Sequence, residues 1–127
     1  ILSKKNLPNI NFKFFDAVIL SEIDTNFENA LKISSSSKIV CYTMGKRGVK
    51  IIINNEIKFF KTLNVIDIDE TGAGDVWGAS FIIFYYLMKK GLNESAALSN
   101  ISASLSVTGI SDKKIPKYNE ILKYYNA

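Results

Sequence analysis

The sequence predicts an α/β fold in one domain, and three stretches carry this prediction. Ala17–Leu20 is a short continuous apolar run, typical of a parallel strand that is buried on both faces. Residues 38–43 contain a β-branched run, which indicates a second buried strand. Residues 76–88 form an apolar run that falls short of the ~20 residues needed to cross a bilayer. This last run therefore indicates a central, buried helix rather than a membrane span.

The composition limits the possible partners and the compartment. The chain has 127 residues, 47% hydrophobic content, a mean hydropathy of +0.09 and a net charge of +4. The positive charge suits an anionic substrate, and because no basic run is interleaved with aromatic residues, nucleic acid is not expected as a partner. Cys41 is the only cysteine, so no intrachain disulfide can form, and its apolar neighbours predict a buried thiol. With no signal-peptide pattern, we expect a cytoplasmic protein without membrane association.

The N-terminal elements follow in order after the first strand. A helix is predicted through Ile33, with Asp24 or Thr25 as its N-cap. Gly45 and Gly48 follow the second strand and require a tight turn, which in its simplest interpretation is a hairpin turn into residues 49–53. Asn54-Asn55 then predicts a type I′ turn that leads into residues 56–60.

The C-terminal elements are predicted to be helical. Residues 63–67 lead as a short strand or extended segment into a small-residue stretch, and a helix is expected from Gly74 to about Lys90 with Gly91 as its C′ residue. A second helix is predicted from Glu94 to about Val107, where many small residues favour close packing. A short helix after Pro116 closes the chain.

The run Gly72-Ala73-Gly74-Asp75 carries the main functional signal. Its small residues allow a tight turn, so that N–H groups of the first helical turn can converge on one anion. A carboxylate beside such a cradle makes chemical sense if it meets a substrate hydroxyl. A dinucleotide fingerprint does not fit, because Trp77 stands where the third glycine should be, and a phosphate-binding Walker A loop would need Gly-Lys-Ser/Thr. The alternative for Asp75 is that it only complements the helix dipole.

The stretch from Asp69 to Asp75, Asp-Glu-Thr-Gly-Ala-Gly-Asp, resembles the C-terminal signature of the ribokinase-like (PfkB) carbohydrate and nucleoside kinases. The resemblance implies a Rossmann-like, ribokinase-type layered sheet with flanking helices. It further implies that Asp75 is the catalytic base and that Gly72, Ala73 and Gly74, with the amide of Asp75, form the anion hole. In this family Asp69 and Thr71 are where a monovalent cation such as K⁺ can bind.

More of the chain agrees with the same family. Ser21-Glu22-Ile23-Asp24 stands where the family usually has N-x-x-E, which implies that Ser21 lies near the nucleotide phosphates and that Asp24 helps to organise Mg²⁺ through water. This is a departure from the pattern, since both side chains are shorter, and Asp24 as a helix cap is the alternative.

Two further matches concern the nucleotide. The run from Thr43 to Gly48 matches T-x-G-x-x-G, which implies that Thr43, Gly45 and Gly48 line the ATP site and that Lys46 or Arg47 lies near phosphate or solvent. Asn100 stands where the family often has Asn or His beside the adenine.

The resemblance runs from about Phe15 to Tyr125 and corresponds only to the C-terminal, nucleotide-side part of such a kinase. Residues 1–127 are therefore interpreted as that part, without the N-terminal substrate and lid part, and the start at Ile1 suggests a fragment. The implied activity is ATP-dependent phosphoryl transfer with Mg²⁺ to a hydroxyl of a small sugar or nucleoside. The implied partners are that substrate, the remainder of the kinase polypeptide and a second copy of the chain. The alternatives are a non-catalytic nucleotide- or anion-binding module and an inactive fragment.

Overall fold

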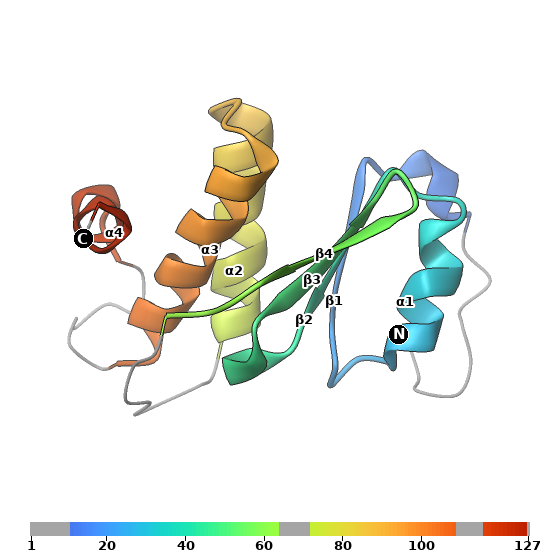
Figure 1. The fold of residues 1–127 in the computed structure, drawn as a ribbon, viewed down its shortest axis with the longest axis horizontal. Coiled ribbons are helices and arrows are strands. Elements are labelled where there is room, and N and C mark those ends of the chain that lie inside the picture. Colours follow the sequence, from blue (N-terminus) through green and yellow to red (C-terminus); the bar gives the residue numbers. More distant parts are fainter. Residues whose placement is uncertain (1–10, 64–71, 109–115, 127) are drawn as a thin grey trace. The chain divides into compact units, whose positions relative to one another are not determined.

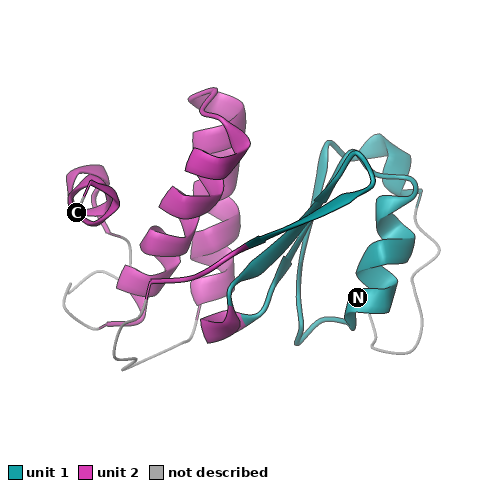
Figure 2. Cartoon of the chain, viewed as in Figure 1, with its two compact units in different colours: residues 1–44, 48–59 teal, residues 45–47, 60–127 magenta. Residues whose placement is uncertain are grey.

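The protein has a mixed α/β fold, seen in a computed structural model that describes residues 11–63, 72–108 and 116–126 (Figure 1). The chain divides into two compact units (Figure 2). Unit 1 comprises residues 1–44 and 48–59, and unit 2 comprises residues 45–47 and 60–127. The α/β fold class predicted from the sequence is confirmed.

Unit 1 contains a four-stranded mixed sheet. Its strands are β1 (Ala17–Ser21), β2 (Ile39–Thr43), β3 (Val49–Ile53) and β4 (Glu56–Phe60), and they lie in the order β1-β2-β3-β4. β1 and β2 are parallel, whereas β2 and β3 are antiparallel. Parallel pairing needs a crossover, and the helix between β1 and β2 supplies it.

Both predicted turns of the sheet are confirmed. Gly45–Arg47 form a short 3₁₀ turn, η2, between β2 and β3, and Met44 N–H donates to the Gly48 carbonyl across it (2.8 Å). Asn54 and Asn55 have φ values of 51° and 62°, as a type I′ turn between β3 and β4 requires.

The crossover helix α1 (Phe27–Ser34) begins later than predicted. Its N-cap is Asn26, whose Oδ1 accepts from Asn29 N–H (2.9 Å), and not Asp24 or Thr25. Thr25 is instead buried, and its carbonyl accepts from the Tyr42 hydroxyl (2.8 Å) while its Oγ1 accepts from Asn29 (2.7 Å). The reason is tertiary: β2 and α1 hold the backbone at Thr25 in the turn that precedes the helix.

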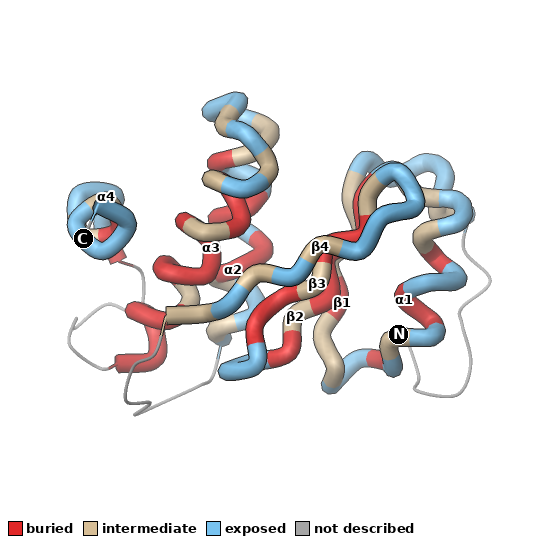
Figure 3. The backbone as a smooth tube through the Cα atoms, in the orientation of Figure 1, coloured by how far each residue is buried: buried red, intermediate tan, exposed pale blue. Residues whose placement is uncertain are grey.

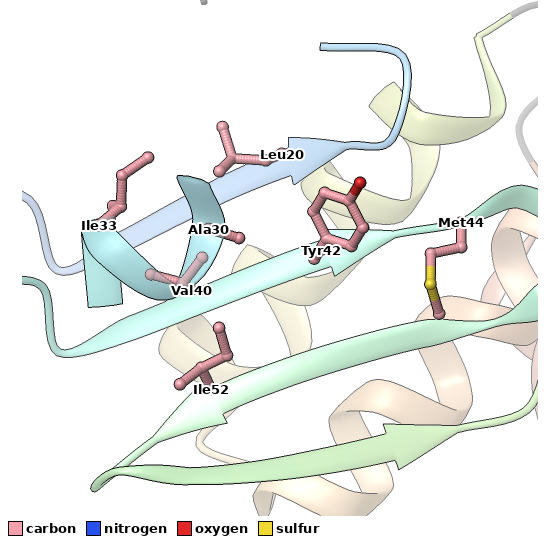
Figure 4. Packing of buried hydrophobic residues seen from close by; sticks show 7 residues of the cluster. All are labelled: Leu20, Ala30, Ile33, Val40, Tyr42, Met44 and Ile52. Carbon is pink, nitrogen blue, oxygen red and sulfur yellow. The ribbon is translucent and has the colours of Figure 1, made fainter. Parts of the chain in front are cut away.

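One hydrophobic cluster joins α1 to the sheet (Figure 4). Its buried members come from β1, α1, β2, β3 and the residue after β2, and they are Leu20, Ala30, Ile33, Val40, Tyr42, Met44 and Ile52. Cys41 lies on β2 between two of these positions and is fully buried, which confirms the predicted buried thiol. Burial raises the pKa of this thiol, because the thiolate would be desolvated.

Unit 2 consists mainly of helices. These are α2 (Ala73–Phe81), a π-helical continuation η3 (Ile82–Leu87), α3 (Leu92–Ser106) and α4 (Tyr118–Tyr125). In unit 1 a short 3₁₀ turn, η1 (Phe12–Phe14), precedes β1. No helix among the described residues is long and apolar enough to span a membrane.

The helical segment made of α2 and η3 ends differently from the prediction. Its regular α-helical part stops at Phe81, and in the π-helical part Met88 N–H donates to Ile83 O (2.8 Å). The left-handed residue after it is Lys89 (φ 57°), not Gly91, which instead precedes α3 as its N-cap. A π-helical turn brings both side chains at i+4 and i+5 close to residue i. Phe81 accordingly stacks on Tyr85 and meets Tyr86 edge-on.

The small-residue helix α3 packs closely, as predicted. Most of its residues are buried (Figure 3), and Ser80 of α2 donates to Ser102 of α3 across the contact (2.9 Å). A second hydrophobic cluster joins η3, α3 and α4, and its buried members are Phe84, Leu98, Ile101, Leu105 and Ile121.

Candidate functional site

Two predicted nucleotide-site residues of unit 1 are brought side by side at one edge of the sheet. Ser21 and Thr43 are the last residues of the parallel strands β1 and β2, and they pair directly in the register. Glu22 N–H donates to the Thr43 carbonyl (3.0 Å), and the Thr43 hydroxyl donates to the Leu20 carbonyl (3.3 Å). The carboxyl edge of parallel strands is where open α/β sheets bind ligands.

Asp24 is held against the same edge. Its Oδ2 accepts from both the backbone N–H of Ser21 (2.9 Å) and the Ser21 hydroxyl (3.0 Å). The interpretation of Asp24 as a helix cap is therefore wrong, since Asn26 caps α1. The Asp24 carboxylate is exposed, so that it can accept bonds from the water shell of a cation while Ser21 fixes its position.

The glycines of the β2–β3 connection have positive φ values, which glycine adopts without the steric cost of a Cβ. Gly45 has φ 57° and Gly48 has φ 100°. Lys46 and Arg47 lie between them and are exposed. Within unit 2, the Lys46 carbonyl accepts from the Thr62 hydroxyl (2.9 Å), which ties this turn to the segment that follows β4.

The small-residue stretch forms the start of α2. Gly72 is the N-cap, with φ 83° and ψ 0°, and no side chain caps the helix. The first bond of the helix runs from Val76 N–H to the Gly72 carbonyl (3.0 Å). The amides of residues 73–75 precede this bond and are, by position, the unsatisfied donors of a helix start.

The surroundings of this helix start suit an anion. Gly72, Gly74 and Asp75 are exposed, and Ala73 is half-buried. A Cβ built on Gly72 or Gly74 would meet no described atom within 4 Å beyond the neighbouring residues and the helix's own backbone. The aligned N–H groups and the positive end of the helix dipole favour a phosphate there, with the Asp75 carboxylate beside it.

Replacing Gly72 and Gly74 with alanine is expected to change the free energy of unfolding in opposite directions. Gly72→Ala is expected to lower the free energy of unfolding by about 1–2 kcal/mol, because a left-handed conformation is unfavourable for a residue with a Cβ. Gly74→Ala is expected to leave stability unchanged or to raise it by up to about 1 kcal/mol, because alanine favours the helix and its Cβ meets nothing. Urea unfolding followed by circular dichroism measures both. An equal loss in the two variants would contradict the left-handed helix start.

An aromatic column lies behind the start of α2, and the sequence pattern did not reveal it. Trp77 stacks on Phe81 with ring centroids 5.1 Å apart, and Phe81 stacks on Tyr85 at 5.2 Å. Trp77 is 3% exposed and Phe81 is fully buried. The i, i+4, i+8 spacing was a signal for this column, although an all-apolar helix does not single out one stripe.

Asn100 is buried in the middle of α3, where its amide bonds to the protein. Its Oδ1 accepts from Trp77 Nε1 (2.7 Å), and its Nδ2 donates to the carbonyls of Lys61 (2.7 Å) and Phe60 (3.4 Å). The side chain is 2% exposed. The adenine contact implied by the family stays a prediction, and the observed bonds give this residue a structural connection that the sequence did not predict.

Two predicted cation ligands, Asp69 and Thr71, lie outside the described residues. Within the described part of the chain, no group of three or more His, Cys, Asp or Glu side chains could hold a metal ion.

Solved structures identify the fold. Ribokinase from Thermotoga maritima superposes on the chain with a TM-score of 0.82 at 25% identity, over 91% of this chain and 44% of that one. A candidate ribokinase II from E. coli, solved with ATP and Mg²⁺, has a TM-score of 0.79 at 21% identity over 91% of this chain and 40% of that one. The chain therefore has the fold of ribokinase-like kinases.

The sequence points to the same class. The chain is 30% identical over 120 residues to an uncharacterized sugar kinase from Pyrococcus horikoshii, a match that covers 92% of this chain and 38% of that protein. No protein-family model matches the chain. The chain is thus similar in sequence to a sugar kinase and in fold to ribokinase, and it spans about two fifths of the length of the relatives it matches.

Proposed function

We propose that this chain supplies the nucleotide-side part of a kinase that transfers the γ-phosphoryl group of ATP to a hydroxyl of a small sugar or nucleoside. The observation that carries the proposal is the start of α2, where an exposed carboxylate, Asp75, follows open backbone amides behind a left-handed Gly72. The relationship to sugar kinases supports it. Residues beyond this chain, in the remainder of a kinase polypeptide, would form most of the acceptor pocket.

In the proposed reaction Asp75 acts as the general base. The acceptor hydroxyl oxygen forms a bond to the γ-phosphorus, its proton passes to the Asp75 carboxylate, and the bond from the γ-phosphorus to the bridging oxygen breaks, with its electron pair leaving on ADP. Gly72, Ala73 and Gly74, with the amide of Asp75, would place donors against the phosphoryl oxygens as charge redistributes in the transition state.

The sheet edge of unit 1 is proposed to serve the nucleotide. Ser21 and Thr43 would lie near its phosphates, and Asp24 would orient a hydrated Mg²⁺ that neutralises phosphate charge. In support, the three side chains are held together at the carboxyl edge of β1 and β2. The backbone of Gly45 and Gly48 would line the ATP site, and Lys46 would bring a positive charge near the phosphates. A monovalent cation at Asp69 and Thr71 remains part of the proposal.

The proposal is tested by ATP binding and by turnover. We expect calorimetric titration with ATP to show binding that depends on Mg²⁺. In the complete kinase polypeptide, we expect ADP release to rise above the ATPase background with at least one member of a sugar and nucleoside panel. ATP binding without transfer to any acceptor would favour the alternative, a non-catalytic nucleotide-binding module. If neither ATP nor inorganic phosphate binds, the proposed nucleotide site is wrong.

A further inference from the structure

The buried side-chain amide of Asn100 bonds to the chain on both sides of the small-residue motif. We call residues 60–63 the entry flank of this motif and residues 76–77 its exit flank. On the entry side, its Nδ2 donates to the carbonyls of Phe60 and Lys61 (3.4 and 2.7 Å). On the exit side, its Oδ1 accepts from the indole N–H of Trp77 (2.7 Å), which lies two residues after Asp75. All of these residues belong to unit 2.

These bonds engage both the donor end and the acceptor end of a buried carboxamide. An asparagine offers two N–H donors and one carbonyl acceptor, and an indole offers only one donor. Because Asn100 is 2% exposed and Trp77 is 3% exposed, water cannot replace a partner that is lost. The arrangement is therefore specific for asparagine, whose acceptor faces one flank and whose donors face the other.

Neighbouring side chains reinforce the entry flank. Ser104, one turn further along α3, donates to the Leu63 carbonyl (3.4 Å), and the Thr62 hydroxyl donates to the Lys46 carbonyl (2.9 Å) in the glycine turn. On the exit flank, Trp77 is clamped by its stack on Phe81. The entry flank is thus bonded to α3 through Asn100 and Ser104. The exit flank is bonded to α3 through Asn100 and also stacks on Phe81.

We propose that Asn100 is a positioning residue, which fixes the start of α2 relative to the segment 60–63 and thereby sets the place of Asp75 and of the amides at 73–75. Its effect on phosphoryl transfer rests on the proposed kinase function, whereas its effect on the start of α2 does not. Asn100 acts through Trp77 and the 60–61 backbone and not through a contact with the adenine.

The test compares Asn100→Leu with Ser102→Ala. Leucine has a similar size but removes all three bonds of Asn100. Ser102→Ala removes a buried bond of 2.9 Å between the same two helices, without touching residues 60–63. In hydrogen–deuterium exchange, we expect Asn100→Leu to accelerate the amides of residues 61–63 and the bonded amides of residues 76–77 by at least about tenfold relative to those of α4, because the opening is local. Ser102→Ala should change both regions to the same extent.

Measuring kcat and the KM for ATP distinguishes a positioning role of Asn100 from a direct contact with the nucleotide. A misplacement of about 1 Å at a reacting group costs about 10²-fold in rate, so Asn100→Leu should lower kcat at least about tenfold and leave the KM for ATP within about threefold. An adenine contact would instead raise the KM and spare kcat. Should the protein show no transfer at all, the kinase proposal fails, and the exchange pattern still decides the positioning role.

Two further variants guard against a misfolded Asn100→Leu. Trp77→Phe keeps an aromatic ring but removes the indole N–H together with part of the fused ring, and Ser104→Ala removes the hydroxyl that donates to Leu63. Each is expected to accelerate exchange at the flank it holds, the bonded amides of residues 76–77 for the first and residues 61–63 for the second. Uniform acceleration over the whole unit in these variants and in Asn100→Leu would overturn the proposal and leave Asn100 as a residue of general stability.

Discussion

In the complete kinase polypeptide, Asp75→Asn is expected to lower the turnover of phosphoryl transfer by about 10²- to 10⁴-fold, the usual contribution of a general base. The amide has the size of the carboxylate but cannot take the proton of the acceptor hydroxyl. Asp75 is exposed in the first turn of α2, so the substitution should not disturb the fold. ADP release measures turnover, and calorimetric titration should show ATP affinity changed by less than about threefold, since the proton acceptor contributes little to nucleotide binding.

Glu94→Gln is the matched control for Asp75→Asn. Glu94 is the acid in the first turn of α3, and it forms a salt bridge of 3.5 Å with Lys90. Its replacement removes the same favourable interaction with a helix dipole, worth about 0.3–1 kcal/mol, at a position with no proposed role in transfer. Turnover should therefore stay at the parental value. If Asp75→Asn were as active as this control, the assignment of Asp75 as base would be wrong.

Local backbone chemistry made much of the fold predictable. The strand at residues 38–43 and the Asn54-Asn55 turn were confirmed, because β-branched runs and residues that tolerate positive φ determine conformation over a few positions. The start of α2 was predictable for the same reason, since only small residues allow the left-handed Gly72 and the open first turn. Family resemblance then suggested a use for this geometry.

The errors lie where distant contacts override a local preference. Asp24 was a reasonable cap by sequence, yet its carboxylate bonds to Ser21 at the strand end, and Asn26 caps the helix. Gly91 was expected to end a long helix, but the π-helical turn that brings Tyr85 and Tyr86 to Phe81 places Lys89 in the left-handed position. Neither outcome follows from propensities along the chain.

The role of Asn100 shows the same limit at the candidate site. Its bonded partners are 23 residues away at Trp77, and 39 and 40 residues away at Lys61 and Phe60. An asparagine among the serines and alanines of a close-packed helix carries no sign of which backbone it will meet. A buried polar residue must find partners, and that requirement was the one available signal.

Phe81→Ala is expected to lower the free energy of unfolding by about 3–5 kcal/mol, the cost of truncating a buried aromatic side chain. Phe81 is fully buried and stacks on Trp77 and on Tyr85, so its loss opens a cavity in the middle of the column. Since a small domain has only about 5–15 kcal/mol in total, the variant should unfold at a much lower urea concentration. Equilibrium unfolding followed by the fluorescence of Trp77, the only tryptophan, measures the loss.

Ile82→Ala, one position further along the same helical segment, provides the comparison. Ile82 is 46% exposed, so truncating it should cost about 1 kcal/mol or less. A difference of at least about 2 kcal/mol between the two variants would show that the column at Trp77, Phe81 and Tyr85 anchors α2. Equal costs would mean that the helix is held by other contacts. The position of Asp75 would then depend on contacts outside the column, among them the Asn100 bonds, and Asn100→Leu, not Phe81→Ala, would have the larger effect on turnover.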